Sequence, residues 1–361
     1  MTGVSKREMA ARILGGHLAG SLGGLFGGGL RILAYHRVLN DDPASFPYDG
    51  GVISCSTRVF EEQVSFVAKN FDVISFNDLR AFEDGRIKLP GRPLVITFDD
   101  GYVDNYTNAF PVLKRAGISA TIFLAAGYIG KDQLFWWDAV AYAVKHSRFR
   151  SVVLPQISPT PIQLESAANK QRAVAAILQW IKGAPDASKN RLVEDLPQVL
   201  GVDLNPARRQ RMQLSWDEVR EMAACNIEFG SHTLTHPILS NVAPGQLERE
   251  IAGSKKLIEK ELNKEIIAFA YPVGGKHHFN PEVAAAVAQT GYRYAVSYIN
   301  GVPALDQVLS PSWPSLSLQE CTGHRSSERF SMSRIHVEAA DSMRLFRANL
   351  MFPGIMLGSA V

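Results

Sequence analysis

Two short stretches of the sequence carry side chains whose types and spacing fit hydrolysis at a metal centre. Asp99 and Asp100 are adjacent carboxylates in the segment TFDDGY, and His232 and His236 lie four residues apart in the segment SHTLTH. Two imidazoles on one side of a turn can share a metal ion that a carboxylate completes, which leaves positions open for water and substrate. The competing interpretations are a solvated turn for the aspartates and a surface or capping pair for the histidines.

Both stretches follow short apolar runs that predict buried strands. Residues 94–98 (LVITF) precede Asp99, and residues 227–230 (IEFG) lead to His232. Apolar runs of this length suit a parallel sheet, in which functional side chains gather at the carboxyl ends of the strands. Successive side chains on a strand point in opposite directions, so we expect the two carboxylates to have different functions.

Together, residues 97–102 and 231–236 resemble the first two motifs of the polysaccharide deacetylases, carbohydrate esterase family 4. The resemblance extends over about residues 30–297 and implies a distorted (β/α)7-type barrel with a metal site. It also implies the removal of acetyl groups from N-acetylated sugars. Residue by residue, it implies that Asp99 is the general base and that the metal ligands are Asp100, His232 and His236.

The third motif of this family, Arg-x-Pro-Tyr-Gly, is matched by AYPVG at residues 270–274. Ala270 therefore stands where the family has the arginine that steadies the base. The resemblance implies that the backbone N–H of Val273 donates to the oxyanion, and we expect Tyr271 and Tyr102 to contribute to substrate binding. The missing arginine also motivates an alternative, a glycan-binding relative without catalytic activity.

Two histidines are candidates for the general acid. His36 lies in LAYHRV at residues 33–38, which resembles the N-terminal Tyr-His motif of the biofilm poly-N-acetylglucosamine deacetylases. In that branch the strand that bears the acid is circularly permuted to the front of the chain. His336, in SRIHV at residues 333–337, matches the family's late Leu-x-His motif only loosely. We therefore assign the acid to His36 and interpret His336 as a structural residue.

Alternating apolar runs and amphipathic segments predict the parallel α/β architecture that positions these groups. We expect a Gly-rich extension at 1–29, a catalytic domain at 30–330 with a mostly helical insertion at about 131–213, and a C-terminal segment at 331–361. Asn108 and Asn280 are expected helix N-caps, and Ser215 with Glu218 forms an expected capping box. The pair Trp136 and Trp137 either stacks on sugar rings or anchors the insertion. The predicted strands are 30–35, 71–75, 94–98, 120–125, 227–230, 266–270 and 294–297.

The composition is that of an ordinary globular protein. The 361 residues are 46% hydrophobic and 20% charged, and a formal net charge of +3 gives no indication of a nucleic-acid surface. The three cysteines lie far apart and form no CxxC pair. Basic residues precede an uncharged stretch at 13–30, but its many glycines and the lack of a clean cleavage site argue against a signal peptide, and the glycines dilute the hydrophobicity that a spanning helix needs. We expect a cytoplasmic or inner-membrane-associated protein, with peripheral attachment through the N-terminus as an option.

The function predicted from these residues is a metal-dependent hydrolase that removes N-acetyl groups from an N-acetylated polysaccharide or glycan, in exopolysaccharide biosynthesis. Two histidines with one carboxylate favour Zn²⁺ as the cofactor, although such sites also accept Co²⁺, Ni²⁺ or Fe²⁺. An O-acetyl esterase, another metal-dependent amide hydrolase and the non-catalytic relative are the alternatives. The expected partner is the glycan substrate.

Overall fold

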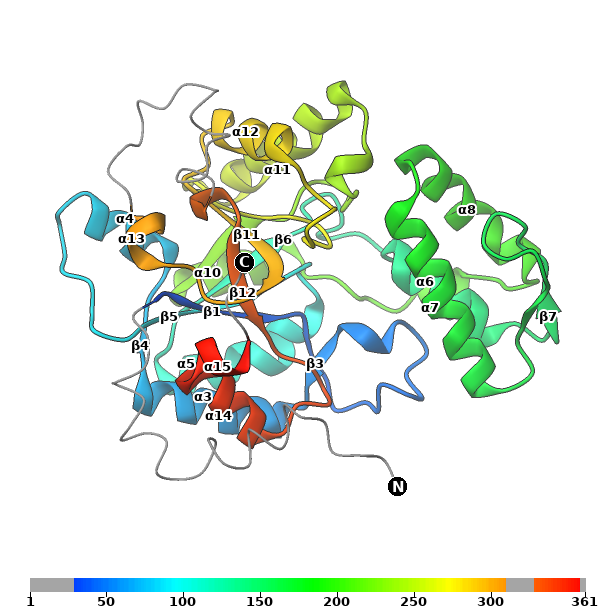
Figure 1. Ribbon diagram of the computed structural model, residues 1–361, viewed down its shortest axis with the longest axis horizontal. Coiled ribbons are helices and arrows are strands. Elements are labelled where there is room, and N and C mark those ends of the chain that lie inside the picture. The colour runs from blue at the N-terminus through cyan, green and yellow to red at the C-terminus, as the bar shows by residue number, and fades with distance from the viewer. Residues whose placement is uncertain (1–28, 310–327, 358–361) are drawn as a thin grey trace.

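A computed structural model describes residues 29–309 and 328–357 of the protein, and its core is a closed barrel of parallel strands (Figure 1). The first strand pairs with both the last strand and β5, which closes a ring of seven strands, and β4 extends β5 at the outside. The predicted (β/α)7-type barrel is confirmed. In ring order the strands are β1 (Arg31–Tyr35), β12 (Met332–His336), β11 (Tyr294–Asn300), β10 (Ala268–Ala270), β9 (Ile227–Ser231), β6 (Ala120–Leu124) and β5 (Pro93–Phe98), with β4 at Asp72–Val73.

Helices surround the barrel and bury one face each. In α3 (Thr57–Asn70), the side chains of Phe60, Val64 and Val67 face the core, at the intervals that predict an amphipathic helix. The capping box of Ser215 and Glu218 forms as predicted. The helices are α3 (Thr57–Asn70), α4 (Phe76–Glu83), α5 (Phe110–Ala116), α10 (Trp216–Ala224), α11 (Pro244–Leu262), α12 (Pro281–Gln289), α13 (Leu305–Val308), α14 (Met343–Met351) and α15 (Pro353–Met356).

One predicted helix start is wrong. Asn108 does not cap α5, because a π-helical turn over Asn105–Ala109 already precedes this helix. The Asn108 amide instead donates to the carbonyl of Val38 over 2.7 Å, which ties the helix start to the segment after β1. By contrast, Asn280 caps α12 as predicted, since its side chain accepts from the N–H of Val283.

The strand β12 lies beyond residue 330, where the sequence predicts the catalytic domain to end. It pairs with β1 and β11 and is the seventh strand of the barrel. The barrel therefore continues into the segment 331–361, and α14 packs its Phe346 against Phe66 of α3. The sequence obscures this strand because Arg334, a charged residue, occupies a position inside the barrel.

The segment at about 131–213 is mostly helical and lies to one side of the barrel in Figure 1. Its helices enclose an apolar cluster of their own, to which Phe46 and Tyr48 from the loop after β2 (Arg37–Val38) contribute. The insertion returns to the barrel where Gln213 pairs with Tyr102. Its elements are α6 (Trp136–His146), β7 (Ser151–Val152), β8 (Ile162–Gln163), α7 (Ala167–Gly183), α8 (Asp186–Val199) and α9 (Asn205–Arg208).

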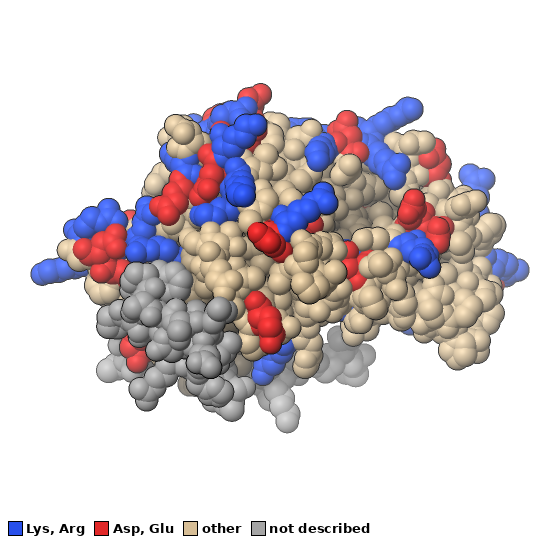
Figure 2. All heavy atoms as spheres, turned by 90° about the horizontal axis from the view of Figure 1, so that it is seen from above, with Lys and Arg blue, Asp and Glu red and all other residues tan. Residues whose placement is uncertain are grey.

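Acidic and basic side chains are interspersed over the face shown in Figure 2. Within residues 29–309 and 328–357, no helix combines the length and the apolar character that crossing a membrane requires. The expectations for the Gly-rich N-terminal extension, its membrane attachment included, lie almost wholly outside the described residues.

Candidate active site

The ends of three barrel strands meet at a cavity of about 240 Å³. His36 follows β1, Asp99 and Asp100 follow β5, and His232 follows β9. The register pairs Tyr35 of β1 with Phe98 of β5, so the residues that come next, His36 and Asp99, lie beside each other. The opposite wall comes from the insertion, which contributes Trp136, Trp137, Leu178 and Lys182.

Asp100, His232 and His236 form a buried group with metal-ligand geometry. Their ligand atoms all lie within 4.8 Å of one another. The Oδ1 atom of Asp100 is 3.4 Å from Nε2 of His236 and 3.6 Å from Nε2 of His232. Within the described part of the chain this oxygen has no hydrogen-bond partner. Because an unpartnered buried carboxylate oxygen is costly, the three side chains fit a divalent cation placed between them.

A strained loop aims the second histidine at this group. Thr233 and His236 both have positive φ angles, of 69° and 54°, as does Asp100 at 75°. The carboxylate of Glu250 on α11 accepts hydrogen bonds from the backbone N–H groups of Leu234 and Thr235 at 2.9 and 2.8 Å. Strained backbone persists only where its surroundings hold it, and this buried carboxylate holds the loop.

The two histidines are supported in different ways. Nδ1 of His232 lies 2.7 Å from the carbonyl oxygen of Ala270, which fixes its proton on Nδ1 and leaves the lone pair of Nε2 facing Asp100. Nδ1 of His236 has no partner among the described residues. Its ring is held by packing against Trp137, with ring centroids 4.4 Å apart, and its carbonyl accepts a 3.2 Å hydrogen bond from the Trp136 indole.

Asp99 is bound by an arginine that the motifs did not reveal. The guanidinium of Arg334, on β12, donates to both carboxylate oxygens of Asp99 at 2.8 and 2.6 Å. Arg334 is fully buried and also donates to the carbonyl of Ser297 at 2.7 Å. Burial by itself raises the pKa of Asp99, but the charge of Arg334 outweighs burial and holds this pKa below its ordinary value. Asp99 is therefore an ionised carboxylate at neutral pH.

His36 and His336 lie in different surroundings. Nε2 of His36 is 3.9 Å from Oδ2 of Asp99, and the imidazole lines the cavity. Burial lowers the pKa of His36 to about 4, against the opposing effect of the Asp99 charge. His336 stacks in parallel on Tyr298, with centroids 3.7 Å apart, and does not line the cavity.

Of the three remaining predicted residues, Val273 and Tyr271 border the cavity and Tyr102 does not. Val273 lines the cavity with a φ of 59°, and its N–H has no acceptor among the described residues. Tyr271 also borders the cavity, although its hydroxyl donates to the carbonyl of Phe330 at 2.7 Å. Tyr102 is fully buried, so the predicted direct contact with substrate is not available in this conformation. Its hydroxyl donates to Asp138 at 2.8 Å and accepts from the Trp137 indole at 2.7 Å.

Residues 86–295 match the sequence model of the polysaccharide deacetylase family, which is more than half of the chain. The chain belongs to the polysaccharide deacetylase family. The membership predicted from the two motifs is therefore confirmed. The match ends before Arg334, so the residue that binds Asp99 lies outside the part of the deacetylase that the family model describes.

Three known proteins are similar to this deacetylase. YxkH of Bacillus subtilis is 26% identical over 279 residues, which cover 77% of this chain and 67% of YxkH. The poly-β-1,6-N-acetyl-D-glucosamine N-deacetylase of Escherichia coli is 32% identical over 87 residues, 24% of this chain and only 12% of that enzyme. The deacetylase PplD of Streptococcus pyogenes, solved with acetate, has the same fold with a TM-score of 0.55 at 17% identity, over 88% of this chain and 96% of PplD.

In the deacetylase site, burial and nearby charges shift the pKa values of the three candidate metal ligands. Burial lowers the pKa of His232 and of His236, so both imidazoles are neutral near pH 7 and can coordinate a cation. Burial and the nearby charge of Asp99 raise the pKa of Asp100. A cation between the three groups would offset both effects on Asp100.

Proposed function

We propose that this deacetylase hydrolyses N-acetyl groups of an N-acetylated polysaccharide, with poly-β-1,6-N-acetylglucosamine as the first candidate. One observation carries the proposal: an ionised carboxylate, Asp99, lies beside a separate buried group of metal ligands in one cavity. The short similarity to the Escherichia coli enzyme supports the choice of polymer. We further propose Zn²⁺ as the native metal, because two histidines and one carboxylate are a common catalytic zinc set.

The roles of the side chains follow from their positions. A divalent cation held by Asp100, His232 and His236 would polarise the acetyl carbonyl and lower the pKa of a water molecule. Asp99 accepts the proton that this water loses as its oxygen attacks the carbonyl carbon. The free N–H of Val273 donates to the carbonyl oxygen as negative charge develops on it.

The departing nitrogen needs a proton, and we assign its delivery to His36. Because its pKa is about 4, His36 is neutral in the resting protein at pH 7. The proton that Asp99 takes from water can pass to His36, whose Nε2 is 3.9 Å from Oδ2. Cleavage of the C–N bond then releases acetate and the free amine, and Asp99 returns to its ionised state.

The test is acetate release from β-1,6-linked N-acetylglucosamine oligomers by metal-free protein and by protein reloaded with Zn²⁺. We expect release only with metal, and loss of release in Asp99→Asn with metal still bound. The same assay on O-acetylated glycans separates an esterase from an N-deacetylase. Binding of the oligomers without acetate release at any metal loading would contradict the proposal and favour a non-catalytic relative.

A further inference from the structure

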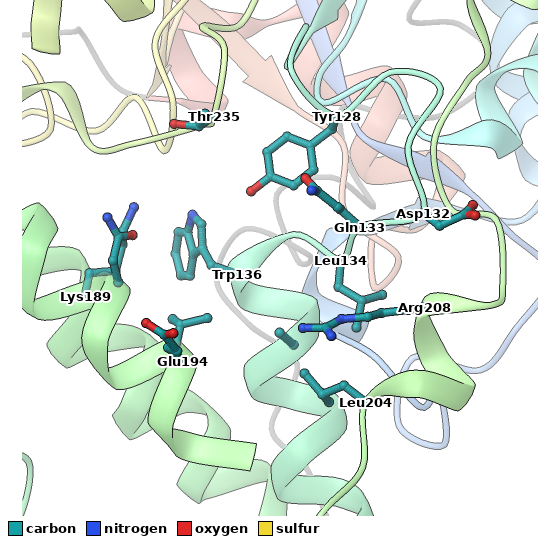
Figure 3. Close-up of a pocket in the computed structure, with 13 residues that line it drawn as sticks. Tyr128, Asp132, Gln133, Leu134, Trp136, Lys189, Glu194, Leu204, Arg208 and Thr235 are labelled. Carbon is teal, nitrogen blue, oxygen red and sulfur yellow. The ribbon is translucent and has the colours of Figure 1, made fainter. Parts of the chain in front are cut away.

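A second and larger cavity adjoins the catalytic one. It has a volume of about 730 Å³, within the usual range for ligand sites, and lies between the loop after β6 and the insertion helices α6 and α8 (Figure 3). Trp136 lines both cavities. Thr235, between the two histidine ligands, borders the larger cavity as well. The two cavities are therefore neighbours that share Trp136 as a wall.

Trp136 is a fixed boundary between the two cavities. Its indole N–H is engaged by the carbonyl of His236, and Trp137 packs perpendicular to it at a centroid distance of 5.0 Å. In the view of Figure 3 the indole lies between Lys189 on α8 and the side chains of Tyr128 and Gln133. A rigid aromatic edge offers an apolar surface without a large entropy cost on binding.

Several polar side chains that line the larger cavity are open to solvent, among them Gln133, Glu194 and Arg208. Within the described residues, no hydrogen bond involves the side chains of Tyr128, Gln133, Glu194 or Arg208, all of which line it. They supply a hydroxyl, an amide, a carboxylate and a guanidinium, which together offer both donors and acceptors. This combination of aromatic edges and unpaired polar groups suits a sugar, whose rings have apolar faces and hydroxyl-bearing rims.

The charges of the cavity indicate what kind of sugar chain it fits. Two acidic residues, Asp132 and Glu194, and two basic residues, Lys189 and Arg208, line it. The ammonium of Lys189 is already paired with Asp186 at 2.7 Å. That pairing leaves two carboxylates and one guanidinium along the cavity, an excess of negative charge that favours an uncharged polymer over a strongly anionic one.

We propose that the larger cavity is a binding subsite for the sugar units next to the one that is deacetylated, so that the insertion makes this protein selective for an uncharged N-acetylated polymer over single sugars. The inference rests on the proposed function and names its substrate class. Binding energy gained at a distance from the reacting acetyl group is available to lower the reaction barrier. Catalytic efficiency should therefore rise with the number of sugar units until the cavity is filled.

The experiment compares a monosaccharide with a tetramer of N-acetylglucosamine in two assays. One measures kcat/KM for acetate release by Zn²⁺-loaded protein, and the other measures binding to Asp99→Asn by calorimetry. Gln133→Ala should lower the tetramer-to-monomer ratio of kcat/KM about tenfold, which corresponds to about 1.4 kcal/mol. Glu194→Trp, on the exposed side of α8, should lower the ratio by filling the cavity. Gln163→Ala, an exposed glutamine of β8 elsewhere on the insertion, is the matched control and should leave the ratio unchanged.

Each result has a distinct meaning. A ratio that neither cavity variant changes, or a parent protein equally efficient on monomer and tetramer, overturns the subsite. Tetramer binding to Asp99→Asn that Gln133→Ala weakens, without acetate release by the metal-loaded parent, contradicts the proposed activity but supports the cavity as a glycan site. Preference for an anionic polymer of equal length overturns the assignment to an uncharged one.

Discussion

Arg334 and Asp99 form a bidentate, buried ion pair that joins β12 to the end of β5, the two strands that flank β1. The residues are 235 positions apart in the chain, and the guanidinium also bonds Thr97 of β5 at 3.1 Å. Arg334 thus supplies to Asp99, the proposed base, the positive charge that Ala270 cannot. The absence of arginine from the third motif is therefore no argument against activity, because the barrel provides the same group from another strand.

Replacing Arg334 by methionine should raise the pKa of Asp99, since burial would then act unopposed. The acid limb of the pH profile of kcat/KM should shift to higher pH, and activity at neutral pH should fall by about 100-fold or more. Breaking a buried pair on one side typically costs about 3–5 kcal/mol of stability, so circular dichroism must confirm folding. Arg334→Lys, which keeps the charge but loses the two-pronged contact, should show a smaller shift. An unchanged acid limb in both variants would show that Arg334 does not tune the base.

Substitution of the two adjacent aspartates, one at a time, should affect proton transfer and metal binding separately. Asp99→Asn should retain stoichiometric metal and lose activity by roughly 10²–10⁴-fold, the contribution of a positioned base. Asp100→Asn should lose the metal, because it removes the negative ligand between the two imidazoles. Metal content by mass spectrometry, measured beside acetate release, checks both. Metal loss in Asp99→Asn with normal metal in Asp100→Asn would reverse the two roles.

Trp137 should affect metal affinity through the ring of His236, whose Nδ1 has no hydrogen-bond partner in the part of the chain that the structure describes. Trp137→Phe removes the indole N–H that bonds Tyr102 and loosens this packing, so the metal dissociation constant should rise by about tenfold. Competition with a chelator gives the constant without reference to activity. Trp180→Phe, which borders a separate surface cavity of the insertion, is the control for the same substitution. Equal constants in the two variants would show that packing by Trp137 does not position the ligand.

Asp138 should make the stability of the protein depend on pH. Burial raises its pKa to about 6, above the value of about 4 for an unfolded chain. The folded state thus binds the proton more tightly, so the free energy of unfolding should decrease as pH rises from about 4 to about 6 and then level off. Asp138→Asn should lack this decrease. Urea midpoints of both proteins across this range test it, and parallel curves would contradict the raised pKa.

The sequence predicts the parts of the site that lie in contiguous motifs. Asp99 and His232 each follow an apolar run, and strand order then brings the two together without further information. Arg334 could not be found in this way, because its contact with Asp99 depends on barrel closure and on the register of β12 with β1. The useful signal was a charged residue between Met332 and Ile335, which fits a strand only if its charge is neutralised inside. The burial of Tyr102 could not be predicted for a related reason, because it depends on the hydrogen bonds of its hydroxyl with Asp138 and Trp137 of the insertion.

Closure of the barrel by β12 also determines when the site can exist during synthesis. Asp99 and the three candidate metal ligands have left the ribosome once residue 236 has emerged, yet β1 lacks one of its two neighbours until residue 336 follows. Until then Asp99 is a buried-site carboxylate without its counter-charge, and His36 stands on a strand paired on one edge only. The ion pair between Asp99 and Arg334 therefore cannot form before the two distant ends of the barrel join, and activity that depends on this pair cannot arise earlier.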